Sequence, residues 1–319
     1  MAKRGKRPRT AIQRRRLAYL LLSPALLVML LVYVIPGIQL VYISLLNLTT
    51  ETLLQYLGAP FAGFRHYAQI INGLLGNETS LIQGLFLAIR NTFWYTLWVE
   101  LGTLGLGLAA ALLLNRRFWW RGLALTVLIL PWVVPSAATG IMWRSIWRQE
   151  GGLANLILYN WLQVTDEPIS WLMLEHSRTA LIVPSIWRWL PFTSVVFLAR
   201  LRTIPGEIYE AASLDGANGR QKLRFLTWPF LLPAFLATAL FGIIYNFFGF
   251  NGYNIGQMLF WSDNFGRYAD LLVPSLVRQT FTNNLYGFGA ATTVLMTSIA
   301  LGLLVLGYRI YTAGSERVA

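Results

Sequence analysis

Residues 17–46 read LAYLLLSPALLVMLLVYVIPGIQLVYISLL, a run of 30 residues without a charged side chain. An α-helix rises 1.5 Å per residue, and about 20 consecutive apolar residues cross the hydrocarbon core of a bilayer. The run is longer than the apolar part of a signal peptide, and it contains Pro24, Pro36 and Gly37. We therefore expect a first membrane helix that the mature protein keeps.

The composition of the chain also indicates a bilayer environment. Of the 319 residues, 56% are hydrophobic and 12% are charged, whereas a soluble domain carries about 25% charged residues. The absence of cysteine excludes a disulfide framework, a thiolate zinc site and a cysteine nucleophile, and two histidines leave little for metals. We expect an all-α polytopic membrane protein that binds no metal or cofactor itself.

Five further apolar stretches reach the length of a membrane span. The six spans are expected at about residues 17–46, 91–114, 122–143, 179–199, 229–250 and 286–308. They form a membrane domain at residues 17–311, between a basic tail at residues 1–16 and a short tail at residues 312–319.

The positive charges predict the orientation of these spans. With the N-terminus inside, 18 of the 26 Lys and Arg residues fall in inner segments and seven in outer loops. Cytoplasmic loops carry an excess of Lys and Arg, so both termini are expected in the cytoplasm. We interpret the basic tail as a contact with anionic lipid rather than with nucleic acid. Binding of RNA or of a regulator is the alternative.

The inner loop at residues 200–228 has a design of its own. Proline has no backbone N–H group, but the N–H groups in the first turn of a helix are unpaired in any case. Pro205 can therefore begin a helix. Ala211 and Ala212 give this helix a small apolar face, and Gly216 can take the left-handed conformation that ends it. A second short helix would follow. Such a knob suits docking into a groove of a partner protein, and the alternative is a hairpin that lies on lipid.

The loop resembles a known family. The residues that carry the resemblance are Glu210, Ala211, Ala212 and Gly216, followed by Leu226, Thr227, Trp228 and Pro229. They resemble the EAA loop of permease subunits of bacterial ABC importers. Two further motifs are similar to the maltose or trehalose permease type, namely residues 130–135 and residues 187–189. The resemblance covers nearly all of residues 17–311 and implies a permease of MetI-like fold with six transmembrane helices.

The resemblance also implies a location, partners and a cargo. Such a permease lies in the bacterial inner membrane, pairs with a second permease as a heterodimer, and receives a di- or oligosaccharide from an extracytoplasmic solute-binding protein. Two cytoplasmic ATPase subunits supply the energy with ATP and Mg²⁺. The loop residues that the resemblance assigns to ATPase coupling are Glu210, Ala211, Ala212, Asp215, Gly216 and Ala217.

No signature of a hydrolase occurs in this chain. A P-loop needs a Gly-rich loop ending in Gly-Lys-Ser or Gly-Lys-Thr, and Lys3, Lys6 and Lys222 lack that context. We expect no catalytic site. The rival of another class is a self-sufficient secondary carrier, which would need acidic residues in its spans and often shows repeated halves. Only Glu100 is such an acid, and no convincing repeat is present.

A sugar that crosses the membrane needs hydrogen-bonding groups and aromatic faces toward a cavity. The residues expected along the pathway are Tyr245, Asn246, Asn251, Tyr253, Ser275, Gln279 and Arg188. By resemblance to the maltose permease type, Asn246 lies near the sugar. The alternative is that these side chains bond neighbouring helices to one another.

Glu100 and Arg188 are the two ionisable residues deep within the expected spans. Each lies 9 or 10 residues from the outer end of its span, a depth of about 14 Å. Because a lone charge is costly there, we predict a buried ion pair between them. Alternatively, Arg188 faces the pathway and binds a carboxylate or phosphate, as an importer of glycerol phosphate or another polar solute would require.

Overall fold

The structure is a computed structural model, which describes residues 11–74 and 80–315. These residues form helices and connecting loops, with an isolated antiparallel bridge between Leu46 and Phe61. Residues 1–10 of the expected basic tail and residues 316–319 lie outside the described residues.

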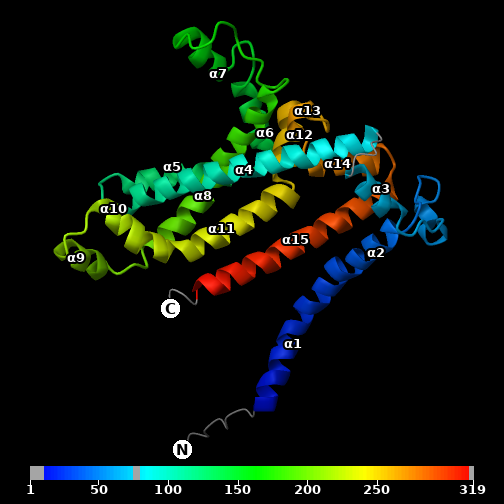
Figure 1. Ribbon diagram of the computed structural model, residues 1–319, viewed down its shortest axis with the longest axis horizontal. Coiled ribbons are helices and arrows are strands. Elements are labelled where there is room, and N and C mark those ends of the chain that lie inside the picture. The colour runs from blue at the N-terminus through cyan, green and yellow to red at the C-terminus, as the bar shows by residue number, and fades with distance from the viewer. Residues whose placement is uncertain (1–10, 75–79, 316–319) are drawn as a thin grey trace, which may run out of the picture.

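The first apolar run forms a bent helical arm that leaves the bundle (Figure 1). It consists of α1 (Ala11–Met29), a π-helical turn η1 (Leu30–Val34) and α2 (Ile35–Ser44). The π-helical turn ends two residues before Pro36, which cannot donate a backbone hydrogen bond and crowds the carbonyl four residues earlier, within the turn. The most apolar part of the arm, within Tyr19–Ser44, is entirely unburied by the rest of the chain.

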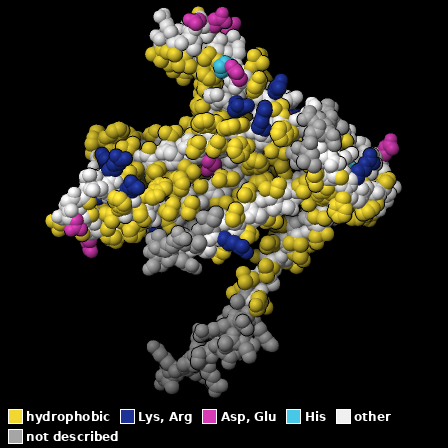
Figure 2. All heavy atoms as spheres, in the orientation of Figure 1, with side chains coloured by type: hydrophobic (Ala, Val, Ile, Leu, Met, Phe, Trp, Pro, Cys, Tyr) yellow, Lys and Arg dark blue, Asp and Glu magenta, His cyan; other side chains and the backbone are white. Residues whose placement is uncertain are grey.

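Four long helices build the bundle. They are α4 (Ser80–Asn115), α8 (His176–Leu201), α11 (Trp228–Phe248) and α15 (Tyr286–Ser315). Helix α4, with 36 residues, is the longest described helix and packs along α8, α11 and α14 (Leu272–Val277). Apolar side chains cover most of the face shown in Figure 2, and Lys and Arg side chains gather mainly toward the helix ends.

The third expected span is broken. Helices α5 (Arg121–Val133) and α6 (Ser136–Ile146) meet at an angle of 101°. Proline disfavours the helical conformation of the residue before it, and Val134 before Pro135 is extended. Within the described part of the chain, five helices are long and apolar enough to cross a membrane, or six if this bent pair is one span.

Two of the four buried hydrophobic clusters in the described residues lie toward opposite ends of the bundle, and we call them the outer and the inner core after the expected orientation. In the outer core, Tyr95 and Val99 of α4 pack with Leu181 of α8 and with Ile255 of α12 (Asn251–Phe260). In the inner core, the largest buried side chain is Phe197 of α8, whose ring stacks on Phe235 at 5.8 Å between ring centres.

Short helices complete the outer and inner ends. On the N-terminal side and between α6 and α8 they are η2 (Leu53–Gly58), α3 (Arg65–Leu74), α7 (Leu153–Asn155) and η3 (Leu156–Trp161). The inner loop contributes α9 (Gly206–Leu214), α10 (Gly219–Lys222) and η4 (Leu223–Thr227). Between α12 and α15 the chain forms α13 (Gly266–Ala269), α14 and η5 (Arg278–Thr282).

The chain between α12 and α14, residues 261–271, is called the outer segment here, and α4 holds it in place. The amide of Asn91 donates to the carbonyl oxygens of Arg267 and Asp270 at 2.9 and 3.1 Å. Asp270 also pairs with Arg278 at 2.6 Å. Burial raises the pKa of Asp270 above its ordinary value, although Arg278 acts in the opposite direction.

Candidate functional site: a helical hairpin and a polar cavity

The expected inner knob is a helical hairpin at one end of the bundle (Figure 1). Pro205 is the extended residue before α9, so α9 begins where proline lacks only an N–H group that would be unpaired anyway. Gly216, with φ +80°, ends this first helix in the left-handed region. Asn218 and Gln221 then start α10 with a reciprocal capping box. We call residues 205–222 the coupling hairpin.

The six residues expected to couple the chain to an ATPase all lie on the coupling hairpin, within α9 or the turn after it. Glu210, Ala211, Asp215 and Gly216 are exposed, while Ala212 and Ala217 are half-buried. Sequence reasoning missed Leu214, an apolar side chain that is 90% exposed beside them. Its position two residues before Gly216, on the last turn of the helix, is the signal that identifies it.

The coupling hairpin is bonded to the chain directly before α11, and the inner end of α11 is bonded to α8. Tyr209 of α9 shares a hydrogen bond of 2.9 Å with Thr227, directly before α11. Arg200 at the end of α8 donates from Nε to the carbonyl oxygen of Phe230 in α11, at 2.8 Å. Tyr209 also packs against the inner core. A displacement of α9 therefore acts on the inner end of α11 through Thr227, and on α8 through the inner core and the bond between Arg200 and Phe230.

A small polar cavity lies between α4, α8 and α11, away from the coupling hairpin. Glu100 of α4 accepts a hydrogen bond of 2.7 Å from the amide nitrogen of Asn246 in α11, and both residues are buried. The rest of the lining is formed by Thr103, Trp189, Phe192, Thr193, Thr238, Phe241, Gly242 and Tyr245. Its volume of about 10 Å³ has room for one water molecule at most. No sugar fits there unless the helices separate.

The predicted ion pair between Glu100 and Arg188 is wrong in this structure. Glu100 bonds Asn246, whereas Arg188 donates from Nε to the carbonyl oxygen of Val134 at 3.2 Å. The break before Pro135 takes Val134 out of the helical hydrogen-bond ladder, and Arg188 satisfies its carbonyl group. Equal depth in the membrane did not bring the two charges to facing sides of their helices.

Apart from Arg188, the expected pathway residues fall into three groups. Tyr245 and Asn246 line the polar cavity. Asn251, Ser275 and Gln279 are buried elsewhere, with an amide-to-hydroxyl hydrogen bond of 3.3 Å from Gln279 to Ser275. Tyr253 donates to Asp263 in the outer segment, at 3.1 Å.

Several of these residues keep unpaired polar atoms although they are buried. Both side-chain polar atoms of Asn251, and the amide oxygens of Asn246 and Gln279, have no hydrogen-bond partner in the structure. Buried polar groups in folded proteins are almost always bonded, so such orphans mark sites where a partner is to be expected. The indole nitrogen of Trp189, in the lining of the polar cavity, is a further unpaired donor. Trp189 is not among the pathway residues predicted from the sequence, although it belongs to the motif at residues 187–189.

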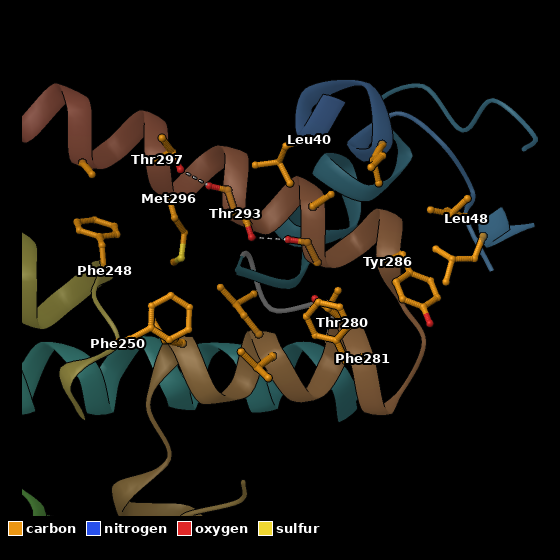
Figure 3. A pocket seen from close by; sticks show the side chains of 18 residues that line it. Leu40, Leu48, Phe248, Phe250, Thr280, Phe281, Tyr286, Thr293, Met296 and Thr297 are labelled. Carbon is orange, nitrogen blue, oxygen red and sulfur yellow. Dashed lines mark hydrogen bonds between the residues drawn. The ribbon is translucent and has the colours of Figure 1, made fainter. Parts of the chain in front are cut away.

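A larger apolar cavity of about 610 Å³ lies between the arm, α14, η5 and α15 (Figure 3). Phe248, Phe250, Phe281 and Met296 belong to its wall. The threonine hydroxyls at positions 293 and 297 bond carbonyl groups of their own helix. The cavity therefore offers few free polar atoms and does not suit a sugar.

Comparisons with known proteins agree with these features. A family described as the inner membrane component of binding-protein-dependent transport systems matches residues 103–319. The arabinooligosaccharides transport system permease protein AraP of Bacillus subtilis is 31% identical over 240 residues, which are 74% of this chain and 75% of that protein. The trehalose/maltose transport system permease protein MalF of Thermococcus litoralis is 29% identical over 275 residues, 76% of this chain and 85% of that protein.

Solved structures show the same fold. The crystal structure of a bacterial ABC transporter that imports the acidic polysaccharide alginate matches with a TM-score of 0.78 and 20% identity, over 95% of this chain and 97% of that chain. The expected fold class and the resemblance carried by the inner loop are thereby confirmed. With its apolar helices, the chain is a multi-pass protein of the inner membrane. It belongs to the family of inner membrane components of binding-protein-dependent ABC transporters.

Proposed function

We propose that this chain is one of two permease subunits that together form the pathway of an ATP-driven sugar importer. An extracytoplasmic solute-binding protein delivers a di- or oligosaccharide. Two ATPase subunits hydrolyse ATP with Mg²⁺, and the coupling hairpin of this chain docks into a cleft of an ATPase subunit. Both termini of this chain lie on the ATPase side, and its basic tail contacts anionic lipid. This chain contributes no catalytic site and binds no cofactor itself.

One observation supports the proposal: the exposed hairpin is bonded to the chain directly before α11, and the inner end of α11 is bonded to α8. Tyr209 of the hairpin bonds Thr227, and Arg200 of α8 bonds the carbonyl oxygen of Phe230 in α11. Farther along the same two helices lie Trp189 and Asn246, which line the cavity. Movement of α9 by an ATPase subunit thus separates or closes the helices around the substrate site.

The sugar is inferred from the chemistry of the polar cavity. Its lining combines amide and hydroxyl groups with the aromatic rings of Trp189 and Tyr245, whose centres lie 4.5 Å apart. None of its lining residues is a cation. Because a phosphate or carboxylate would need a cationic partner, this lining favours a neutral sugar over glycerol phosphate. The names of the relatives from B. subtilis and T. litoralis, both sugar permeases, point in the same direction.

The proposal is tested by uptake and by co-purification from the native host. A strain without this chain is complemented with the wild type, and uptake of radiolabelled maltose, trehalose, arabinotriose and glycerol 3-phosphate is measured. We expect saturable, ATP-dependent uptake of at least one sugar and recovery of an ATPase with the tagged chain. Uptake of glycerol 3-phosphate alone would overturn the sugar assignment, and transport without an ATPase would overturn the importer.

The coupling hairpin has a matched pair of carboxylates for this test. Glu210 and Glu207 are both exposed on α9, about one turn apart. Glu210→Ala should lose ATPase from the purified complex or uncouple hydrolysis from uptake, whereas Glu207→Ala should retain both. Equal behaviour of the two variants would remove Glu210 from the contact.

A further inference from the structure

The carboxylate of Glu100 has an unusual neighbourhood for a membrane helix. Its hydrogen-bond donor in the structure is the amide nitrogen of Asn246, at 2.7 Å. It lies against the backbone of Gly242, one turn before Asn246 on α11, and a Cβ atom at position 242 would collide with both carboxylate oxygens. Glycine at this position therefore makes room for the acid, and the three residues form one packed unit.

This contact determines which way the Asn246 amide faces. In the structure the Asn246 amide turns its nitrogen toward Glu100, whose carboxylate oxygen accepts the hydrogen bond. Its oxygen is then left buried without a partner. Because an unpaired buried acceptor costs free energy, this orientation is useful only if another molecule supplies a donor.

The polar cavity offers a matching donor. The indole nitrogen of Trp189 is also buried without a partner, and Trp189 and Asn246 line the same cavity. A hydroxyl group donates one hydrogen bond and accepts others. One unpaired acceptor and one unpaired donor therefore suit a substrate hydroxyl, and the ring faces of Trp189 and Tyr245 suit the apolar side of a sugar ring.

We infer that Glu100 is a positioning residue, which orients the Asn246 amide so that its oxygen accepts a hydrogen bond from a hydroxyl of the sugar. The inference rests on the proposed function, because it assumes that a sugar enters this cavity. It assigns to Glu100 a role in recognition rather than in proton-coupled transport. The competing role is a purely structural bond between α4 and α11.

The experiment uses the complete importer complex, purified from its native membrane into nanodiscs and freed of the solute-binding protein. Binding of radiolabelled maltose, trehalose and arabinotriose is measured by scintillation proximity, and the thermal stability of each complex is recorded. Glu100→Leu removes the acceptor, and Glu100→Gln keeps an oxygen that can accept from Asn246. Ser194→Ala is the control, because the Ser194 hydroxyl is buried and bonds only the carbonyl oxygen of Leu190 in its own helix.

We expect Glu100→Leu to weaken sugar binding about tenfold and Glu100→Gln to restore most of it. Asn246→Leu should weaken binding at least as much, and the double variant with Glu100→Leu should be no worse than Asn246→Leu alone, because both changes remove the same contact. If Glu100→Leu does not assemble, Gly242→Ala displaces the carboxylate without removing it and should weaken binding similarly.

Two results would overturn the inference while leaving the proposed function intact. One is unchanged sugar affinity in Glu100→Leu with a lowered melting temperature, which is the signature of a structural bond. The other is full additivity of the Glu100 and Asn246 substitutions. Failure of the wild-type complex to bind any of the three sugars would instead overturn the proposed function, and this inference with it.

Discussion

Replacement of Gly216 by alanine isolates the backbone geometry of the coupling hairpin. Gly216 has φ +80°, and a Cβ atom built there meets nothing within 4 Å. The substitution therefore removes no contact and creates no collision. Its cost is the strain of an L-residue in the left-handed region, about 1–2 kcal/mol.

The strain should appear as weaker docking. If the hairpin of the variant relaxes when free and must return to the left-handed turn on docking, 1–2 kcal/mol corresponds to a Kd for the ATPase about 5–30 times higher. The assay is titration of the purified ATPase onto the permease complex in nanodiscs. Gly216→Asn should lie between the wild type and Gly216→Ala, because asparagine tolerates the left-handed region better than alanine does.

A matched control lies three residues away. Gly219 is the first residue of α10, and a Cβ atom built there also meets nothing within 4 Å. Its φ is not positive, so alanine fits it without strain. If Gly216→Ala and Gly219→Ala bind the ATPase equally well, the left-handed turn is unimportant for docking and the reasoning fails.

Two further predictions concern the ends of the bundle. Tyr209→Phe removes the 2.9 Å hydrogen bond to Thr227, worth about 1 kcal/mol. It should lower the amount of sugar transported per ATP hydrolysed while the ATPase still docks, and Thr227→Val should do the same. An unchanged ratio of sugar to ATP in both variants would contradict a role of this hydrogen bond in coupling. Burial raises the pKa of Asp270 above its ordinary value. At a pH between the ordinary and the raised pKa, the native state therefore binds more protons at this residue than the unfolded chain does. The stability of the protein should fall as the pH rises through this interval. Thermal melts from pH 4 to 7 should lose this contribution in Asp270→Asn but keep it in Asp263→Asn, and equal slopes in all three proteins would refute the assignment to Asp270.

The parts of the structure that the sequence predicts well depend on neighbours along the chain. Pro205 and Gly216 define the first helix of the hairpin, because proline favours the first turn and glycine the left-handed end. The interruption of the third span follows in the same way from Pro135. The 101° angle between its two halves does not, since it depends on how α5 and α6 pack against other helices.

The wrong prediction has the opposite character. Helical rise gives the depth of Glu100 and Arg188 in the membrane, but not the direction in which each side chain points around its helix. Trp189, the next residue along α8, lines the polar cavity, and Arg188 bonds the broken span instead. Contacts between residues more than a hundred positions apart, such as Glu100 and Asn246, require knowledge of which helix faces meet.

Helix α4 is unbroken, so the contacts of Asn91 and Glu100 are carried by one rigid helix. Its 36 residues make a rod about 54 Å long, well beyond the hydrocarbon core of about 30 Å. Asn91 is hydrogen-bonded to the outer segment and Glu100 to Asn246, and the two residues lie on this helix about 14 Å apart. Because one continuous helix carries both contacts, a tilt of α4 moves the outer segment and the amide of Asn246 together.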